Sequence, residues 1–211
     1  MIENTSVTQT LSELVGINSV SARSNEEIIN YAAARARRIG MDVRLHPYED
    51  ARGITKINMV AIASPDERGG DGHVELAFVG HTDTVPFDAA WPEATTLTAR
   101  DGNLYGRGAC DTKGFIAAAF GALERTRFDN LTRALALVLT ADEEVGCIGA
   151  KNWWKSGHCP HATASSASRP ACRPIRAGKG YCLADITVRG HEGHSAYPPR
   201  RIGHLPCRAL D

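Results

Sequence analysis

The stretch Ala134-Leu-Ala-Leu-Val-Leu-Thr140, followed directly by Ala-Asp-Glu-Glu144, decides the fold class of this chain. A continuous apolar run predicts a strand that is buried on both faces, because a half-buried strand alternates apolar and polar positions. Lys113 to Arg125 has the apolar spacing of a helix, and Val74 to Gly80 is another short apolar run. Strand, helix and strand in this order predict an α/β fold with a mostly parallel sheet flanked by helices.

Further elements are expected upstream of this unit. Residues 5–20 have helical apolar spacing. A second helix is expected to start at Ser24, with Glu27 three residues on as in a capping box, and to end before Gly40. Short strands are expected at 41–46 and 58–63.

Composition excludes several classes of protein. The chain has 211 residues, of which 43% are hydrophobic and 23% charged, as in an ordinary globular protein. Its 24 basic and 24 acidic side chains cancel, so nothing suggests a nucleic-acid or anionic-membrane partner. The sequence has no run of about 18 apolar residues, so no membrane span is expected. Its start is polar and lacks the pattern of a signal peptide. The six cysteines lack Cys-x-x-Cys spacing, so we expect free thiols and a cytoplasmic protein.

The composition changes after Trp154, where prolines, cysteines and serines replace apolar periodicity up to Pro174. A strand pattern resumes only at 181–188. We therefore expect a first domain at 1–176 and the start of a second at 177–211. A second unit of about 35 residues is too short for a core of its own, so the chain is expected to be truncated.

Chemistry-bearing residues follow the predicted strand ends, where ligands bind in open α/β sheets. They form the clusters His81-Thr-Asp83, Cys110-Asp111 and Asp142-Glu143-Glu144. His81 can bind a metal through one ring nitrogen while Asp83 fixes its tautomer, and Asp111 can hold one or two ions. Adjacent glutamates are costly to bury unless a metal neutralises one of them, which leaves the other as a base. Zinc suits such a set of nitrogen and oxygen ligands.

Ordinary structural roles are open for each cluster taken alone. A His-x-Asp pair is commonly a surface pair or a satisfied core pair. Asp111 could cap the helix that begins at Lys113. Adjacent glutamates are commonest on solvated faces. The occurrence of all these clusters after predicted strands favours a metal site.

Longer motifs around these residues resemble a known enzyme family. Gly80-His-Thr-Asp-Thr-Val-Pro86, Tyr105-Gly-Arg-Gly-Ala-Cys-Asp-Thr-Lys-Gly114 and Thr140-Ala-Asp-Glu-Glu144 resemble signatures of the zinc-dependent aminoacylase and acetylornithine deacetylase metallopeptidases. Gly190-His-Glu-Gly-His-Ser-Ala-Tyr-Pro198 resembles the lid-domain motif of that family. The resemblance extends to about Pro198. It implies a two-metal, aminopeptidase-like catalytic domain at 1–176 and an α+β lid and dimerisation domain from 177.

The resemblance also implies roles for single residues. It implies two divalent metals, zinc or cobalt, held by His81 on one ion, Glu144 on the other and Asp111 between them. Asp83 would orient His81, and Glu143 would be the general base. His194 would polarise the scissile carbonyl, reaching it across a homodimer.

Within the family, His81-Thr-Asp-Thr-Val-Pro-Phe-Asp88 and Arg173-Pro-Ile-Arg-Ala-Gly-Lys179 are most similar to the enzymes that deacetylate N2-acetylornithine in arginine biosynthesis. A succinyl-diaminopimelate desuccinylase or a general aminoacylase is the alternative substrate assignment. A truncated, inactive metal-binding remnant and a non-enzymatic interaction module are further alternatives. Metal content and activity on an N-acylated amino acid distinguish them.

The chain departs from the family pattern where a further acidic ligand is expected. It has Ser165-Ser-Ala-Ser-Arg-Pro-Ala-Cys172 there, with no acid, and the final histidine ligand of the family is absent. His158, Cys159 and His161 are weak substitutes, because their spacing supports no site. One permissible set of codons for residues 166–172, read in a shifted frame, encodes Val-Gly-Glu-Pro-Thr-Ser-Leu. Codons for residues 199–208, read in the other shifted frame, can likewise encode a helix. We therefore expect that the sequence is a frame-shifted reading of a longer enzyme, or a remnant.

Overall fold

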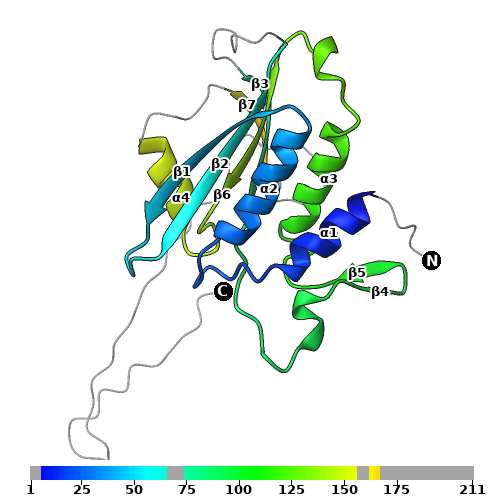
Figure 1. The fold of residues 1–211 in the computed structure, drawn as a ribbon. Helices are drawn as coiled ribbons and strands as arrows, with labels where there is room; N and C mark the ends of the chain where they lie inside the picture. The colour runs from blue at the N-terminus through cyan, green and yellow to red at the C-terminus, as the bar shows by residue number, and fades with distance from the viewer. Residues whose placement is uncertain (1–5, 66–73, 156–161, 167–211) are drawn as a thin grey trace, which may run out of the picture. The chain divides into compact units, whose positions relative to one another are not determined.

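The computed structural model of the chain describes residues 6–65, 74–155 and 162–166 (Figure 1). The expected domain boundary at 176/177, the strand at 181–188 and His194 lie outside these residues. So do His158, Cys159 and His161, the weak substitutes for the missing ligands. The two-domain division therefore stays a prediction.

A mixed sheet forms the centre of the described residues. It has five strands in the order β1-β2-β6-β3-β7. The strands are β1 (Asp42–Glu49), β2 (Thr55–Ala63), β3 (Val74–His81), β6 (Ala134–Thr140) and β7 (Ala162–Ser166). β3 runs parallel to β6 and β7, whereas β2 is antiparallel to both β1 and β6.

The predicted α/β class is confirmed, but the sheet is mixed where a mostly parallel one was expected. The parallel half is the strand–helix–strand unit that the apolar runs predict. The antiparallel β1–β2 pair follows from a short connection. Residues 50–54 join β1 to β2, and a parallel pair needs a crossover of a dozen or more residues.

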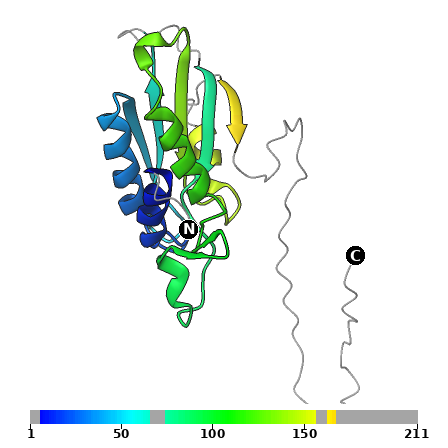
Figure 2. The ribbon, with the colours of Figure 1, turned by 90° about the vertical axis from the view of Figure 1, so that its right-hand side faces the viewer.

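Helices cover both faces of the sheet, as Figures 1 and 2 show. On one face lie α1 (Ser6–Gly16), α2 (Glu26–Arg38) and α3 (Lys113–Leu123); on the other lies α4 (Ile148–Lys155). Leu137 and Leu139 of β6 pack in the core cluster under the first three helices, whereas Val138 packs in the cluster that holds Trp153 of α4. The continuous apolar run of β6 is therefore buried from both sides, as predicted.

Short elements complete the description. They are the hairpin of β4 (Thr98–Arg100) with β5 (Asn103–Tyr105) and the 3-10 turns Pro92–Thr95 and Phe128–Asn130. The sequence patterns did not predict α4, β7 or this hairpin.

The start of α2 differs from the expected capping box. The residue that precedes the helix is Asn25, and it makes no side-chain cap. Its buried amide instead accepts from the backbone N–H of Ile57 at 2.9 Å and donates to the Ile57 carbonyl at 2.8 Å. Ser24 accepts only from the N–H of Glu26. Asn25 thus joins the helix start to β2, which local capping patterns cannot reveal.

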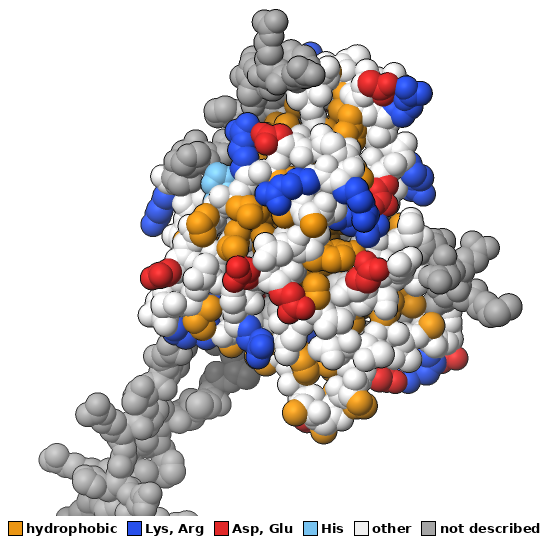
Figure 3. Space-filling model, viewed as in Figure 1, with side chains coloured by type: hydrophobic (Ala, Val, Ile, Leu, Met, Phe, Trp, Pro, Cys, Tyr) orange, Lys and Arg blue, Asp and Glu red, His pale blue; other side chains and the backbone are white. Residues whose placement is uncertain are grey.

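Surface features agree with the composition. On the face in Figure 3, acidic and basic side chains are interspersed and neither sign gathers into one large patch. Cys110 and Cys147, the cysteines within the described residues, are free and exposed. Among the described residues, no helix has the length and apolar character needed to cross a bilayer.

Candidate metal centre

His81 is the last residue of β3 and lies at the carboxyl edge of the sheet. β3 and β6 are parallel, with His81 in register with Thr140, so both strands deliver their next residues to the same edge. The N–H of Thr82 donates to the carbonyl of Thr140 at 2.9 Å and fixes this alignment. His81 therefore lies beside the turn that carries Glu143 and Glu144.

Asp111 reaches the same place from the turn that precedes α3. Thr112 holds this turn against β3, since its hydroxyl donates to the carbonyl of His81 at 2.9 Å. Thr112, not Asp111, is the residue that precedes the helix, so the capping alternative for Asp111 is not what the structure has. The side chain of Asp111 is 67% exposed and free to take a ligand from the open side.

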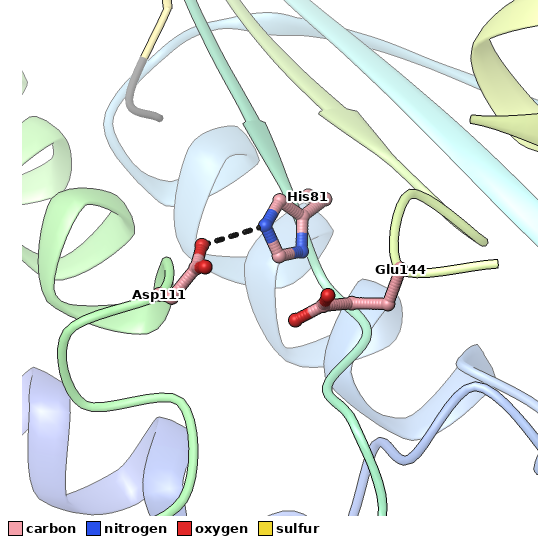
Figure 4. A group of neighbouring side chains, drawn as sticks. All are labelled: His81, Asp111 and Glu144. Carbon is pink, nitrogen blue, oxygen red and sulfur yellow. Dashed lines mark hydrogen bonds and ion pairs between the residues drawn. The ribbon is translucent and has the colours of Figure 1, made fainter. Parts of the chain in front are cut away.

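These segments bring together His81, Asp111 and Glu144, whose potential ligand atoms all lie within 4.8 Å of one another. Figure 4 shows the two carboxylates on either side of the imidazole, each from a different segment. One imidazole nitrogen and two carboxylates are a ligand set that zinc and similar divalent ions accept. Their assignment as metal ligands remains a prediction, now with a geometry that permits it.

The hydrogen-bond environment of His81 is what a metal ligand needs. Nδ1 lies 3.0 Å from the backbone carbonyl of Asp83, and Nε2 lies 3.0 Å from Oδ1 of Asp111. Both partners are acceptors, and a neutral imidazole has a single N–H to donate. Burial opposes protonation of the ring, but the charge of Asp83 and the bond to Asp111 raise the pKa of His81. If Nδ1 carries the N–H, the lone pair of Nε2 faces the Asp111 carboxylate. A divalent cation at Nε2 would remove this repulsion.

The carboxylate of Asp83 does not orient His81, although the sequence predicts that it would. Its backbone carbonyl, not its carboxylate, faces Nδ1 of His81, and Oδ1 stays 3.7 Å away from that nitrogen. The buried carboxylate instead accepts from the backbone N–H of Glu143 at 3.0 Å and of Glu144 at 3.1 Å. Asp83 therefore fixes the turn that carries both glutamates, while its backbone selects the tautomer of His81.

The two glutamates differ in surroundings. Burial raises the pKa of Glu144, and the carboxylates of Asp111, Glu143 and Asp83 raise it further against the effect of His81. A cation among these carboxylates would relieve that repulsion. Glu143 is 39% exposed, and its Oε2 lies 3.8 Å from Nε2 of His81. It borders the site and remains open to solvent.

Sequence patterns missed the residues behind the turn. Lys56 at the start of β2 donates to Asp142 Oδ1 at 2.7 Å, and Tyr48 in β1 donates to Asp142 Oδ2 at 2.8 Å. Ser21 donates to Asp83 Oδ2 at 2.7 Å. The sequence offers one local signal for these residues: Lys56 stands two positions before the apolar run at 58–63, outside the strand that this run predicts.

Comparison with known proteins shows which family the chain is similar to. Residues 77–178 match the model described as Peptidase family M20/M25/M40. The chain is 48% identical over 191 residues to an acetylornithine deacetylase of Myxococcus xanthus, covering 90% of this chain and 48% of the relative. It is 35% identical over 200 residues to an acetylornithine deacetylase of Yersinia pseudotuberculosis, covering 91% of this chain and 51% of the relative. The chain thus spans about half the length of the curated relatives it matches.

Solved structures show the same fold. A metallo-carboxypeptidase of the M20 family from Sulfolobus solfataricus matches with a TM-score of 0.61 and 20% identity, over 78% of this chain and 38% of that one. Human carnosine dipeptidase 1 matches with a TM-score of 0.58 and 24% identity, over 71% of this chain and 34% of that one. The resemblance that the motifs predict is confirmed: this chain is a relative of peptidase family M20/M25/M40, and residues 77–178 are the part that the family model matches.

Proposed function

We propose that the chain is about half of a metal-dependent amide hydrolase that removes the acetyl group from N2-acetylornithine, in arginine biosynthesis. The observation that carries the proposal is the convergence of His81, Asp111 and Glu144 within 4.8 Å, with Glu143 at the rim. The substrate assignment draws on relatives named acetylornithine deacetylase at 48% and 35% identity. A cytoplasmic location and a homodimer of the full-length enzyme belong to the same proposal.

His81, Asp111 and Glu144 would hold two divalent ions, zinc or cobalt, with Asp111 shared between them. Such ions, when bound, polarise the amide carbonyl and make a neighbouring water more acidic. The chain's contribution is to keep the imidazole in one tautomer through the Asp83 carbonyl and to gather the carboxylates at one edge of the sheet. The further acidic and histidine ligands expected of the family are not among the described residues.

Glu143 is the proposed general base. It takes the proton of the attacking water and returns it to the leaving amine, which gives ornithine and acetate. The Asp83 carboxylate accepts from the backbone N–H of Glu143, so the base stands on a fixed turn. Asp83 thereby supports catalysis without touching the substrate. His194 would polarise the scissile carbonyl in the assembled dimer.

The test compares this chain with an extended version, in which the residues from 165 onward are replaced by the corresponding and following residues of the Myxococcus xanthus relative. Release of ornithine from N2-acetylornithine is measured beside hydrolysis of N-succinyl-diaminopimelate, and bound metal is measured on both proteins. We expect deacetylation by the extended version and little by the chain alone, because a catalytic zinc site usually has three protein ligands per ion.

The other outcomes separate the alternatives. Metal without hydrolysis in the extended version would indicate an inactive remnant. Absence of metal from both proteins would contradict the proposal. Comparable deacetylation per mole by both would show that the missing ligands were misassigned.

A further inference from the structure

A buried polar cluster lies behind the Glu143–Glu144 turn. It consists of Lys56, Tyr48 and Asp142. The side chains of Lys56 and Asp142 are 1% and 2% exposed, and their charged atoms are 2.7 Å apart. Tyr48 donates its hydroxyl proton to the second oxygen of Asp142 at 2.8 Å. Both carboxylate oxygens of Asp142 are therefore held by partners from the β1–β2 hairpin.

Asp142 also sets the path of the backbone into the site. Its φ is 56°, in the left-handed region that aspartate tolerates better than most residues. Its carbonyl accepts from the N–H of Ile148 at 3.0 Å, which closes the turn that follows. The glutamates at 143 and 144 thus leave Asp142 in a direction that its side chain and carbonyl contacts both restrain.

Lys56 connects this anchor to the other side of the turn. Besides Asp142, it donates to the carbonyl of Ser21 at 2.7 Å. The hydroxyl of Ser21 donates to Asp83, whose carboxylate accepts from the N–H groups of Glu143 and Glu144. The turn is held from one side through Asp142 and from the other through Asp83. Lys56 contacts Asp142 directly and is connected to Asp83 through Ser21.

Stability alone does not account for such a cluster. Burying an ion pair carries a desolvation cost, and apolar replacements of similar volume are often neutral or stabilising. Hydrogen bonds to both carboxylate oxygens of Asp142 fix the orientation of its side chain, and an apolar replacement could not supply them.

We propose that Lys56, Tyr48 and Asp142 are positioning residues that hold the Glu143–Glu144 turn against His81. The proposal rests on the proposed function, since it assigns the cluster a purpose in metal binding and proton transfer. Partners that orient metal ligands from behind typically change metal affinity by 10–100-fold when they are removed.

The test uses Tyr48→Phe and Asp142→Asn in the full chain. Tyr48→Phe removes one oxygen and keeps the ring, and asparagine also tolerates a positive φ. Residue-resolved amide hydrogen exchange is measured without metal, and cobalt affinity is measured by titration. We expect exchange at the Glu143 and Glu144 amides to become faster and cobalt affinity to fall about tenfold. Glu124→Gln, which weakens the remote pair with Arg35, is the matched control and should change neither.

Unchanged exchange and unchanged affinity in the folded variants would overturn the proposal and leave the cluster a structural role only. If Asp142→Asn does not fold, the milder Tyr48→Phe decides the outcome. Absence of cobalt binding from both the wild-type chain and the extended version would contradict the proposed metal site. The exchange rates at 143 and 144 would still show whether the cluster positions the turn, so the two failures are distinguishable.

Discussion

At the residue scale, the site depends on backbone groups as much as on side chains. The carbonyl of Asp83 orients His81, and the N–H groups of Glu143 and Glu144 bind the Asp83 carboxylate. Because the turn is held through its backbone, the glutamate side chains stay available. Glu144 points to the cluster of ligands and Glu143 stays at its rim. Conservative side-chain changes should therefore separate metal binding from proton transfer.

Glu143→Gln should abolish turnover in the extended enzyme and leave metal binding near that of the wild type. The amide keeps the size of the side chain and the backbone bond to Asp83, but it cannot accept the water proton. General bases contribute about 10²–10⁴-fold, so a loss of this size is expected in the deacetylation rate. Loss of metal together with activity would mean that the roles of Glu143 and Glu144 are exchanged.

At the scale of elements, close contacts decide where helices meet the sheet. Gly149 near the start of α4 lies against the end of β6, and a Cβ there would overlap the carbonyl oxygen of Ala141. Asn25, just before α2, bonds to both backbone groups of Ile57. Ile57 lies two residues before Met59, the first residue of β2 that pairs with β6. Helix positions are therefore set by single residues that touch strand ends.

Gly149→Ala should destabilise the chain by about 1–3 kcal/mol, a typical cost of forcing backbone shifts in a tightly packed region. Either α4 or the end of β6 must move, and Asn58 lies in the way at 2.7 Å. Urea unfolding followed by circular dichroism measures the change. Gly16→Ala is the control, because its added methyl group meets nothing within 4 Å. Equal stability of both variants would contradict the close packing.

Asn25→Ala should cost about 2–4 kcal/mol, because it leaves the buried N–H and C=O of Ile57 without these bonds. Asn30→Ala, on the exposed face of the same helix, should be within about 0.5 kcal/mol of the wild type. The same unfolding measurement compares them. A small effect at Asn25 would show that water replaces its amide.

At the scale of the whole molecule, the site is assembled from segments distant in sequence. His81, Asp111 and Glu144 come from the end of β3, the turn before α3 and the turn after β6. No short fragment brings them together, so the site forms only when the sheet and α3 are in place. Metal binding must then stabilise the folded domain as a unit.

Zinc at 100 times its dissociation constant should therefore stabilise the chain by about 2.7 kcal/mol. For a domain of this size, the midpoint of thermal unfolding should rise by about 5–10 °C. His81→Ala should lose most of this shift, whereas His46→Gln, a histidine change in β1, should keep it. Differential scanning calorimetry with and without zinc provides the measurement. An equal shift in His81→Ala would place the metal elsewhere.

The sequence by itself determined the α/β class, the strand–helix–strand unit and the meeting of His81, Asp111 and Glu144 at one edge. These follow from local apolar periodicity and, for His81 and Glu144, from the fact that parallel strands end on the same side. Asp111 reaches that edge from the turn before α3. Only the tertiary structure decided the mixed strand order, the orientation of Asp83 and the joining of Asn25 to β2. The same holds for Lys56 and Tyr48, whose partner Asp142 is 86 and 94 residues away in sequence. Periodicity describes neighbours along the chain, whereas register and hydrogen bonding between distant segments are settled only when the sheet is assembled.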